Sequence, residues 1–100
     1  MLRRLVLDVL KPHNPSILDL SNKLSKLKGI DGVNIITIEI DKEVENVKVV
    51  LEGTDINFSK VKKILEDSGG AVHSIDEVAA GKKIIEEVET PQDHYKTYLR

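Results

Sequence analysis

The order of its apolar patterns is the feature that most constrains how this chain folds. Alternating apolar residues, typical of half-buried strands, occur over residues 5–9, 33–41 and 47–51, and a less regular run covers 72–78. Helical apolar spacing fills the intervals at 17–27 and 58–65. Two right-handed crossovers then place both helices on one side of a single antiparallel sheet. We therefore expect an α+β, ferredoxin-like βαββαβ sandwich with sheet order 4-1-3-2.

Capping and turn residues bound these segments. Asn14-Pro15 predicts that the first helix begins there, with Asn14 as N-cap and proline at the first helical position. A turn near residues 41–45 joins the second and third strands as an antiparallel hairpin. Asn57 is the expected N-cap of the second helix, and Gly69-Gly70 ends it. Apolar residues spaced by three in the last strand predict a bulge around Ser74–Asp76.

The strand phases divide the sheet into two faces. Leu24 of the first helix and Val49 of the third strand are expected in the layer between helices and sheet. The opposite, open face is expected to carry a mixed set of side chains: Asp8, Thr37, Glu39, Lys48 and Glu52, with Val6, Ile35 and Val50 among them. Such a surface suits either water or a neighbouring subunit.

Two regions follow from this reading, a ferredoxin-like domain over residues 1–81 and a C-terminal extension over residues 82–100. In the extension only Ile84, Ile85 and Val88 are apolar over residues 82–89, and their spacing suits strand and helix equally. Three apolar side chains are too few for an independent core. We expect the extension to pack on a sheet edge or groove of its own subunit or of a neighbouring one.

Composition excludes several classes of function. The 17 acidic and 15 basic residues give a net charge of −2, and no cationic stripe is available to neutralise a nucleic-acid backbone. The absence of cysteine excludes thiolate nucleophiles, cysteine-ligated zinc and iron–sulfur clusters. The first ten residues are too short and too polar for a signal peptide or membrane span, so a cytoplasmic location is expected. No cofactor is required by any motif.

Two groups of residues are candidate binding sites. Oxygen ligands from several strands suit Ca²⁺ better than Mg²⁺, and the candidate ligands of such a hard cation are Asp8, Glu39, Asp41 and Asp76. Lys11 and His13 stand at the expected start of a helix, where free N–H groups favour a phosphate or carboxylate. The alternative there is an ordinary proline-containing turn with a helix cap.

Several segments resemble an archaeal family of proteins of unknown function, number 211 among such families. The resemblance is carried by residues 4–13, 32–35, 72–78, 81–83 and 87–93, and so covers nearly the whole chain. It implies a ferredoxin-like domain, an archaeal cytoplasmic source and a homo-oligomer, with no established activity.

Two hypotheses of function remain. The first is a non-enzymatic module that assembles into a closed homo-oligomer, such as a ring, and senses a small ligand or a hard cation at its subunit boundaries. The alternative is a small enzyme acting on an anionic metabolite, with Lys11 or Lys48 binding the substrate and His13 or His73 transferring a proton. No catalytic triad, metal motif or cofactor fingerprint supports this alternative.

Overall fold

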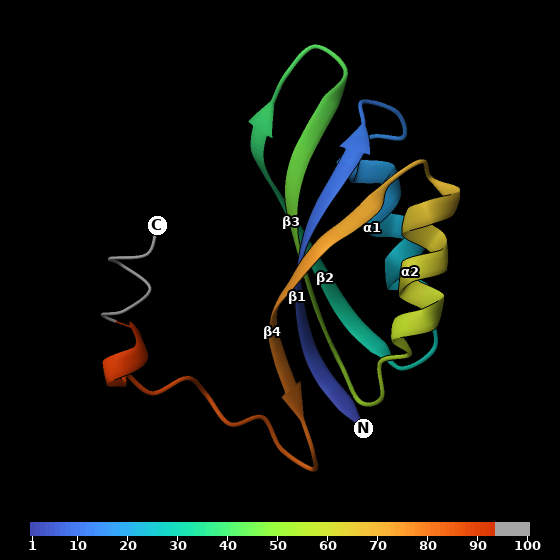
Figure 1. Ribbon diagram of the computed structural model, residues 1–100. Helices are drawn as coiled ribbons and strands as arrows, with labels where there is room; N and C mark the ends of the chain where they lie inside the picture. Colours follow the sequence, from blue (N-terminus) through green and yellow to red (C-terminus); the bar gives the residue numbers. More distant parts are fainter. Residues whose placement is uncertain (94–100) are drawn as a thin grey trace.

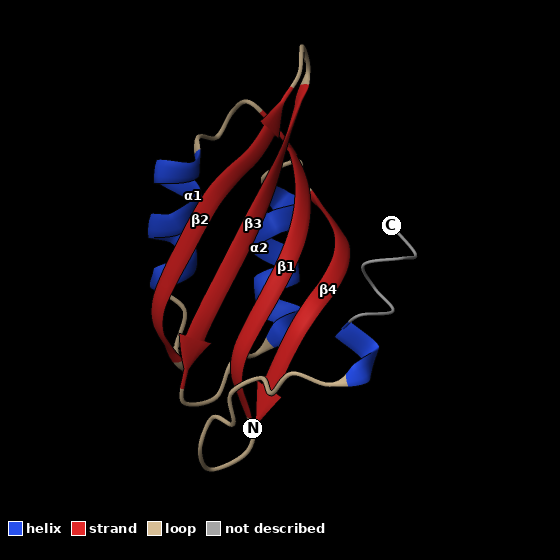
Figure 2. Ribbon diagram, turned by 90° about the vertical axis from the view of Figure 1, so that its left-hand side faces the viewer, coloured by secondary structure: helices blue, strands red, loops and turns tan. Residues whose placement is uncertain are grey.

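The computed structural model describes residues 1–93, and it confirms the predicted architecture; residues 94–100 of the extension lie outside the described residues. The elements are β1 (Leu2–Pro12), α1 (Ile17–Ser25), β2 (Ile30–Ile40), β3 (Val44–Gly53), α2 (Phe58–Asp67) and β4 (Ala71–Ala80). The antiparallel sheet has the order β2-β3-β1-β4, which is the predicted 4-1-3-2 order counted from the other edge. Both helices lie on one face of the sheet, and the other face is uncovered (Figures 1 and 2).

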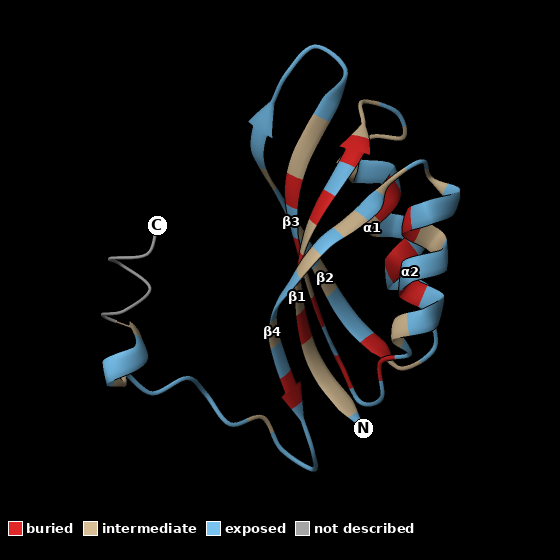
Figure 3. Ribbon diagram, viewed as in Figure 1, coloured by how far each residue is buried: buried red, intermediate tan, exposed pale blue. Residues whose placement is uncertain are grey.

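The core lies between the helices and the two central strands. Leu5, Leu7 and Val9 of β1 stand opposite apolar residues of β3, namely Leu51, Val49 and Val47. All six are at most 2% exposed, and the helices add a buried layer formed by Leu20, Leu24, Val61 and Leu65. Buried positions therefore alternate along the central strands (Figure 3), as the sequence pattern predicts.

The start of α1 differs from the prediction that Asn14 is its N-cap. Ser16 is the N-cap instead, because its hydroxyl accepts a hydrogen bond from the Asp19 backbone N–H at 3.2 Å. The Asn14–Pro15 peptide bond, which is cis, lies in the loop before the helix. The second helix begins as predicted, with the Asn57 side chain accepting from the Lys60 N–H at 3.1 Å.

The predicted phase of β2 is wrong over its middle. Ile35 and Thr37 stand opposite Val49 and Val47, so they lie on the helix-covered side and not on the open face, whereas Ile36 stands opposite Lys48 on the open face. A register irregularity between Thr37 and Glu39 then reverses the phase, so that Glu39 is on the open face as predicted. Ile36 is exposed because it lies on the open face, and Ile38 and Ile40 are exposed at the hairpin end of this edge strand, which the helices do not cover.

The fourth strand contains the predicted irregularity. Its pairing with β1 shifts between Glu77 and Ile75 and again between Ser74 and Val72. These shifts explain why the apolar residues of β4 do not follow a strict two-residue period. Within residues 1–93, neither helix is long and apolar enough to cross a membrane.

Replacing Leu24 or Val49 with Ala should each lower the free energy of unfolding by about 2–4 kcal/mol, because both side chains are fully buried between helices and sheet. Leu18→Ala is the matched control, since Leu18 lies on the same helix as Leu24 but is 70% exposed. Its effect should stay within about 0.5 kcal/mol. Urea titrations of the three variants measure these differences, and equal losses for Leu18 and Leu24 would contradict the described packing.

Candidate functional site

The structure separates the four predicted calcium ligands. Asp8 on β1 accepts a hydrogen bond from the side-chain amide of Asn46 on β3. Asp76 lies on the edge strand β4, where it accepts from the Ser74 hydroxyl at 2.7 Å. Within residues 1–93, no group of three or more histidine, aspartate or glutamate side chains is positioned to hold a metal ion. Calcium binding thus stays a prediction that the geometry of a single chain does not support.

The other two predicted ligands line one small hollow on the open face, at the hairpin end of the sheet. Its volume is about 120 Å³, and the residues that line it are Leu10, Glu39, Asp41, Val44 and Asn46. One Asp41 carboxylate oxygen accepts hydrogen bonds from the N–H groups of Glu43 and Val44, each at 3.1 Å. These two bonds hold the pKa of Asp41 below its ordinary value, so this carboxylate is ionised at neutral pH. The hollow is therefore both acidic and apolar. We call it the hairpin hollow.

The predicted anion-binding lysine is buried in an internal ion pair. The Lys11 side chain is 1% exposed, and its Nζ donates to the carbonyl oxygens of Pro12 at 2.7 Å and His13 at 3.4 Å. Nζ also lies 3.3 Å from Oε1 of Glu45 on β3. A lysine ammonium has three donors, and these three acceptors occupy them. The arrangement favours a structural role for Lys11, because an external anion would meet the Glu45 carboxylate.

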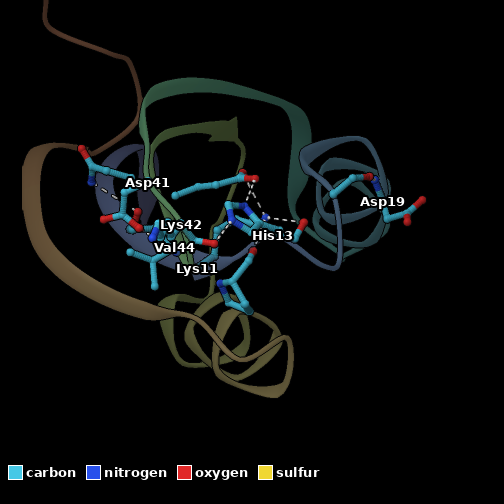
Figure 4. Close-up of polar contacts among 11 residues, drawn as sticks. Lys11, His13, Asp19, Asp41, Lys42 and Val44 are labelled. Atoms are coloured by element: carbon cyan, nitrogen blue, oxygen red, sulfur yellow. Dashed lines mark hydrogen bonds and ion pairs between the residues drawn. The ribbon is translucent and has the colours of Figure 1, made fainter.

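His13 joins the same cluster from the β1–α1 loop (Figure 4). Its Nδ1 lies 2.9 Å from Glu45 Oε2, and its Nε2 lies 2.9 Å from the Lys42 carbonyl oxygen in the β2–β3 turn. Both partners are acceptors only, so both ring nitrogens must donate. A neutral imidazole carries only one N–H. The geometry therefore assigns His13 as the doubly protonated imidazolium.

The charges of this cluster stabilise one another. The hydrogen bond to Glu45 is the largest cause that raises the pKa of His13, followed by the bond to the Lys42 carbonyl. Reciprocally, the hydrogen bond from His13, aided by Lys11, lowers the pKa of Glu45. The cluster thus ties the β1–α1 loop to the turn of the hairpin through one carboxylate.

A second ionic cluster lies on the open face at the other end of β1. Arg4 Nε donates to Glu52 Oε2 of β3 at 2.7 Å, and Nη1 lies 3.4 Å from Glu77 Oε2 of β4. The two Nη atoms also hold both carboxylate oxygens of Glu86, at 2.9 and 3.1 Å. These contacts, chiefly those to Glu86 and Glu52, raise the pKa of Arg4. Arg4 therefore fastens the C-terminal extension to the sheet.

The extension leaves the domain on its open-face side and is not folded back over the sheet (Figures 1 and 2). Arg3 donates to the Lys82 carbonyl oxygen at 2.7 Å, and the Gly81 N–H donates to the Met1 carbonyl oxygen at 2.9 Å. Residues 84–90 have no regular secondary structure, and a helical turn follows at 91–93. Ile85 and Val88 remain 70% and 72% exposed. The predicted packing of these side chains on a surface of their own subunit is thus not observed for Ile85 or Val88.

Sequence reasoning missed Glu45, Asn46, Arg4 and Glu86 as members of these clusters. The sequence did contain a signal for Glu45. It lies two positions from the buried Val47 and so on the same face of its strand, as Lys11 does relative to Val9. Two opposite charges at the end of two buried rows indicate a buried ion pair. No local pattern indicates the Arg4–Glu86 contact, since the two residues are 82 positions apart.

Comparison with known proteins confirms the resemblance stated above. The model of domain-of-unknown-function family 211, described as an uncharacterised ArCR family, matches residues 3–94. An uncharacterised protein of Methanocaldococcus jannaschii is 61% identical to the chain over 94 residues, which are 94% of this chain and 97% of the relative. Neither description names a ligand, a partner or a reaction.

Replacing His13 with Gln should change how folding stability depends on pH. The pKa of His13 is higher in the folded state than its ordinary 6.5, so its contribution is fully present below about pH 6.5 and is lost as the pH rises through the folded value. We expect the free energy of unfolding of the wild type to exceed that of His13→Gln by the largest amount at about pH 6. This difference should shrink by about pH 9. Urea titrations across this range measure it.

His73→Gln is the matched control, because His73 is exposed on β4 and its ring makes no hydrogen bond within the described residues. The same pH dependence in both variants would contradict the assignment of His13 as an imidazolium that is hydrogen-bonded to Glu45 and to the Lys42 carbonyl oxygen. Nitrogen-15 chemical shifts of the His13 ring give an independent reading of whether both nitrogens carry protons.

Proposed function

The chain belongs to the archaeal family of uncharacterised proteins whose model it matches, and from this premise we propose that it is a non-enzymatic module that assembles into a closed homo-oligomer through the open face of its sheet. One observation carries the proposal. Next to the uncovered sheet face, Arg3 and Arg4 fix a C-terminal segment in place, yet its apolar side chains Ile85 and Val88 stay exposed to solvent. Fixing exposed apolar side chains costs conformational entropy and buries no apolar surface in return. A second surface that covers Ile85 and Val88 would therefore stabilise the ordered segment.

The open face has the composition and size of a subunit interface. Apolar side chains lie among its charges: Leu10, Ile36 and Val44 are 39–45% exposed, and Val6 and Val50 are half-buried. Four strands of about ten residues, at about 4.8 Å between strands and 3.3 Å per residue, cover roughly 600 Å². Two such faces bury roughly 1,200 Å², which is at the lower bound for a specific protein–protein interface. The extension adds area on each side.

The enzyme alternative finds less support. Metabolite sites are commonly hollows of about 300–1,000 Å³ with convergent polar groups. A hollow of about 480 Å³ lies between the α1–β2 and β3–α2 loops, and its polar side chains are Lys28, Thr54, Asp55, Asn57 and Lys60. Neither His13 nor His73 lines it, and His13 is bound to Glu45 elsewhere. The hollow therefore contains the cationic side chains of Lys28 and Lys60, but neither of the two histidines to which the alternative assigns proton transfer.

Sedimentation equilibrium at micromolar concentration should give a mass above that of one subunit. Replacing Ile36 with Glu should weaken the assembly at least about tenfold, which is about 1.4 kcal/mol, because it places a charge in the proposed interface. The new carboxylate would stand opposite Lys48 on the neighbouring strand, so the subunit itself should stay folded.

Leu18→Glu is the matched control, since it makes the same kind of change at a 70% exposed position of α1, on the opposite side of the molecule. It should leave the assembly unchanged. A monomeric wild type would refute the proposal, and equal weakening by both variants would remove the open face as the interface.

Calcium is the cation that the sequence predicts for this surface, and a separate measurement tests it. Ca²⁺ takes six to eight oxygen ligands, more than Glu39 and Asp41 supply in the hairpin hollow. We therefore expect weak binding, detectable by calorimetry only near millimolar Ca²⁺ and reduced by Glu39→Gln. Absence of heat, or unchanged heat after Asp8→Asn and Glu39→Gln, would contradict calcium binding by the predicted ligands.

A further inference from the structure

We infer that the hairpin hollow of one subunit is the docking site for Lys83–Ile85 of a second copy of the chain. Lys83 would pair with Glu39 and Asp41, and Ile85 would contact Leu10 and Val44. This inference rests on the proposed homo-oligomer and names the contact that forms it.

The segment that docks is held in place before it meets a partner. On one side of it, Arg3 binds the Lys82 carbonyl oxygen at 2.7 Å, and on the other side Arg4 binds both oxygens of Glu86. Between these two anchors lie Lys83, which is exposed, and Ile85, which is 70% exposed. A short segment fixed at both ends loses little conformational entropy on docking, and this favours affinity.

The segment cannot fill the hairpin hollow of its own chain. Glu86 is held at Arg4, whereas the hollow includes Leu10, six residues further along the same strand. At about 3.3 Å per residue, this separation is roughly 20 Å. Figure 1 shows the hairpin and the start of the extension at opposite ends of the sheet. A second copy must therefore provide the segment.

Charge and shape are complementary between the two surfaces. The hollow carries Glu39 and an ionised Asp41. Within residues 1–93, neither Glu39 nor Lys83 takes part in an ion pair. Its volume of about 120 Å³ is slightly below the roughly 150 Å³ of a cavity that binds benzene, which suits the four-carbon side chain of Ile85. A lysine and an isoleucine two positions apart thus match a hollow with acidic and apolar walls.

A two-fold axis would satisfy both copies at once. When two open faces pack with their strands in opposite directions, the extension of each subunit lies at the hairpin end of the other. Each copy then offers one segment and accepts one, as an isologous interface requires. Repeating the same contact around a ring is the other closed arrangement.

Charge reversal in the full-length chain tests this contact. Lys83→Glu and Glu39→Lys should each weaken self-association at least tenfold in sedimentation velocity, because each places like charges at the contact. An equimolar mixture of the two variants should assemble again, since residue 83 of each subunit then meets an opposite charge at position 39 of the other. Lys62→Glu, on the exposed side of α2, is the matched control and should behave as the wild type.

The outcomes separate this inference from the proposed function. A monomeric wild type would overturn both. An oligomeric wild type whose assembly is unchanged by Lys83→Glu, or two weakened variants that do not assemble when mixed, would overturn the docking contact and leave the oligomer standing. Loss of the wild-type assembly on chelation would show that a cation, and not Lys83, occupies the hollow in the oligomer.

Discussion

One-sided burial of the central strand pair is the constraint on which the rest of this structure depends. β1 and β3 direct Leu5, Leu7, Val9 and their partners toward two helices, and these side chains form the core of the domain. Within residues 1–93, the two helices that pack on the sheet, α1 of nine residues and α2 of ten, cover one face of its four strands. The other face must then be stable in water or be covered by something outside the chain. Its mixture of charges and half-exposed aliphatic side chains is compatible with both.

The same alternation places a charged side chain in the buried layer. Lys11 continues the row of Leu5, Leu7 and Val9, and so it points to the helix side where the core ends. Burying an ammonium is costly unless it is paired and hydrogen-bonded. Glu45 and the carbonyl oxygens of Pro12 and His13 supply those partners, and the Glu45 carboxylate also binds the His13 ring. The positions of Lys11 and His13, which suggested an anion site, are thus explained by the need to pair a buried ammonium at the end of the core.

At the other end of β1, two consecutive arginines connect the domain to its extension. Because neighbouring residues of a strand point to opposite faces, Arg3 and Arg4 reach different partners, yet both bind the segment that follows β4. Their contacts fix residues 82 and 86 but leave Ile85 and Val88 exposed. The proposed assembly and the docking of Lys83–Ile85 are both inferred from this arrangement, because the two arginines hold in place a segment that has no core of its own.

The sequence by itself determined the element order, the sheet topology, the inward rows of the central strands and the start of α2, because each depends on local periodicity or on a cap within three residues. Only the tertiary structure decided the phase of β2, where an irregularity at an edge strand reverses which side chains face the helices. It also decided that Lys11 pairs with Glu45 and that Arg4 pairs with Glu86, contacts that join residues 34 and 82 positions apart. Periodicity reports which face a side chain occupies, but the partner it meets there depends on strand register and on the path of the loops, which no local pattern encodes.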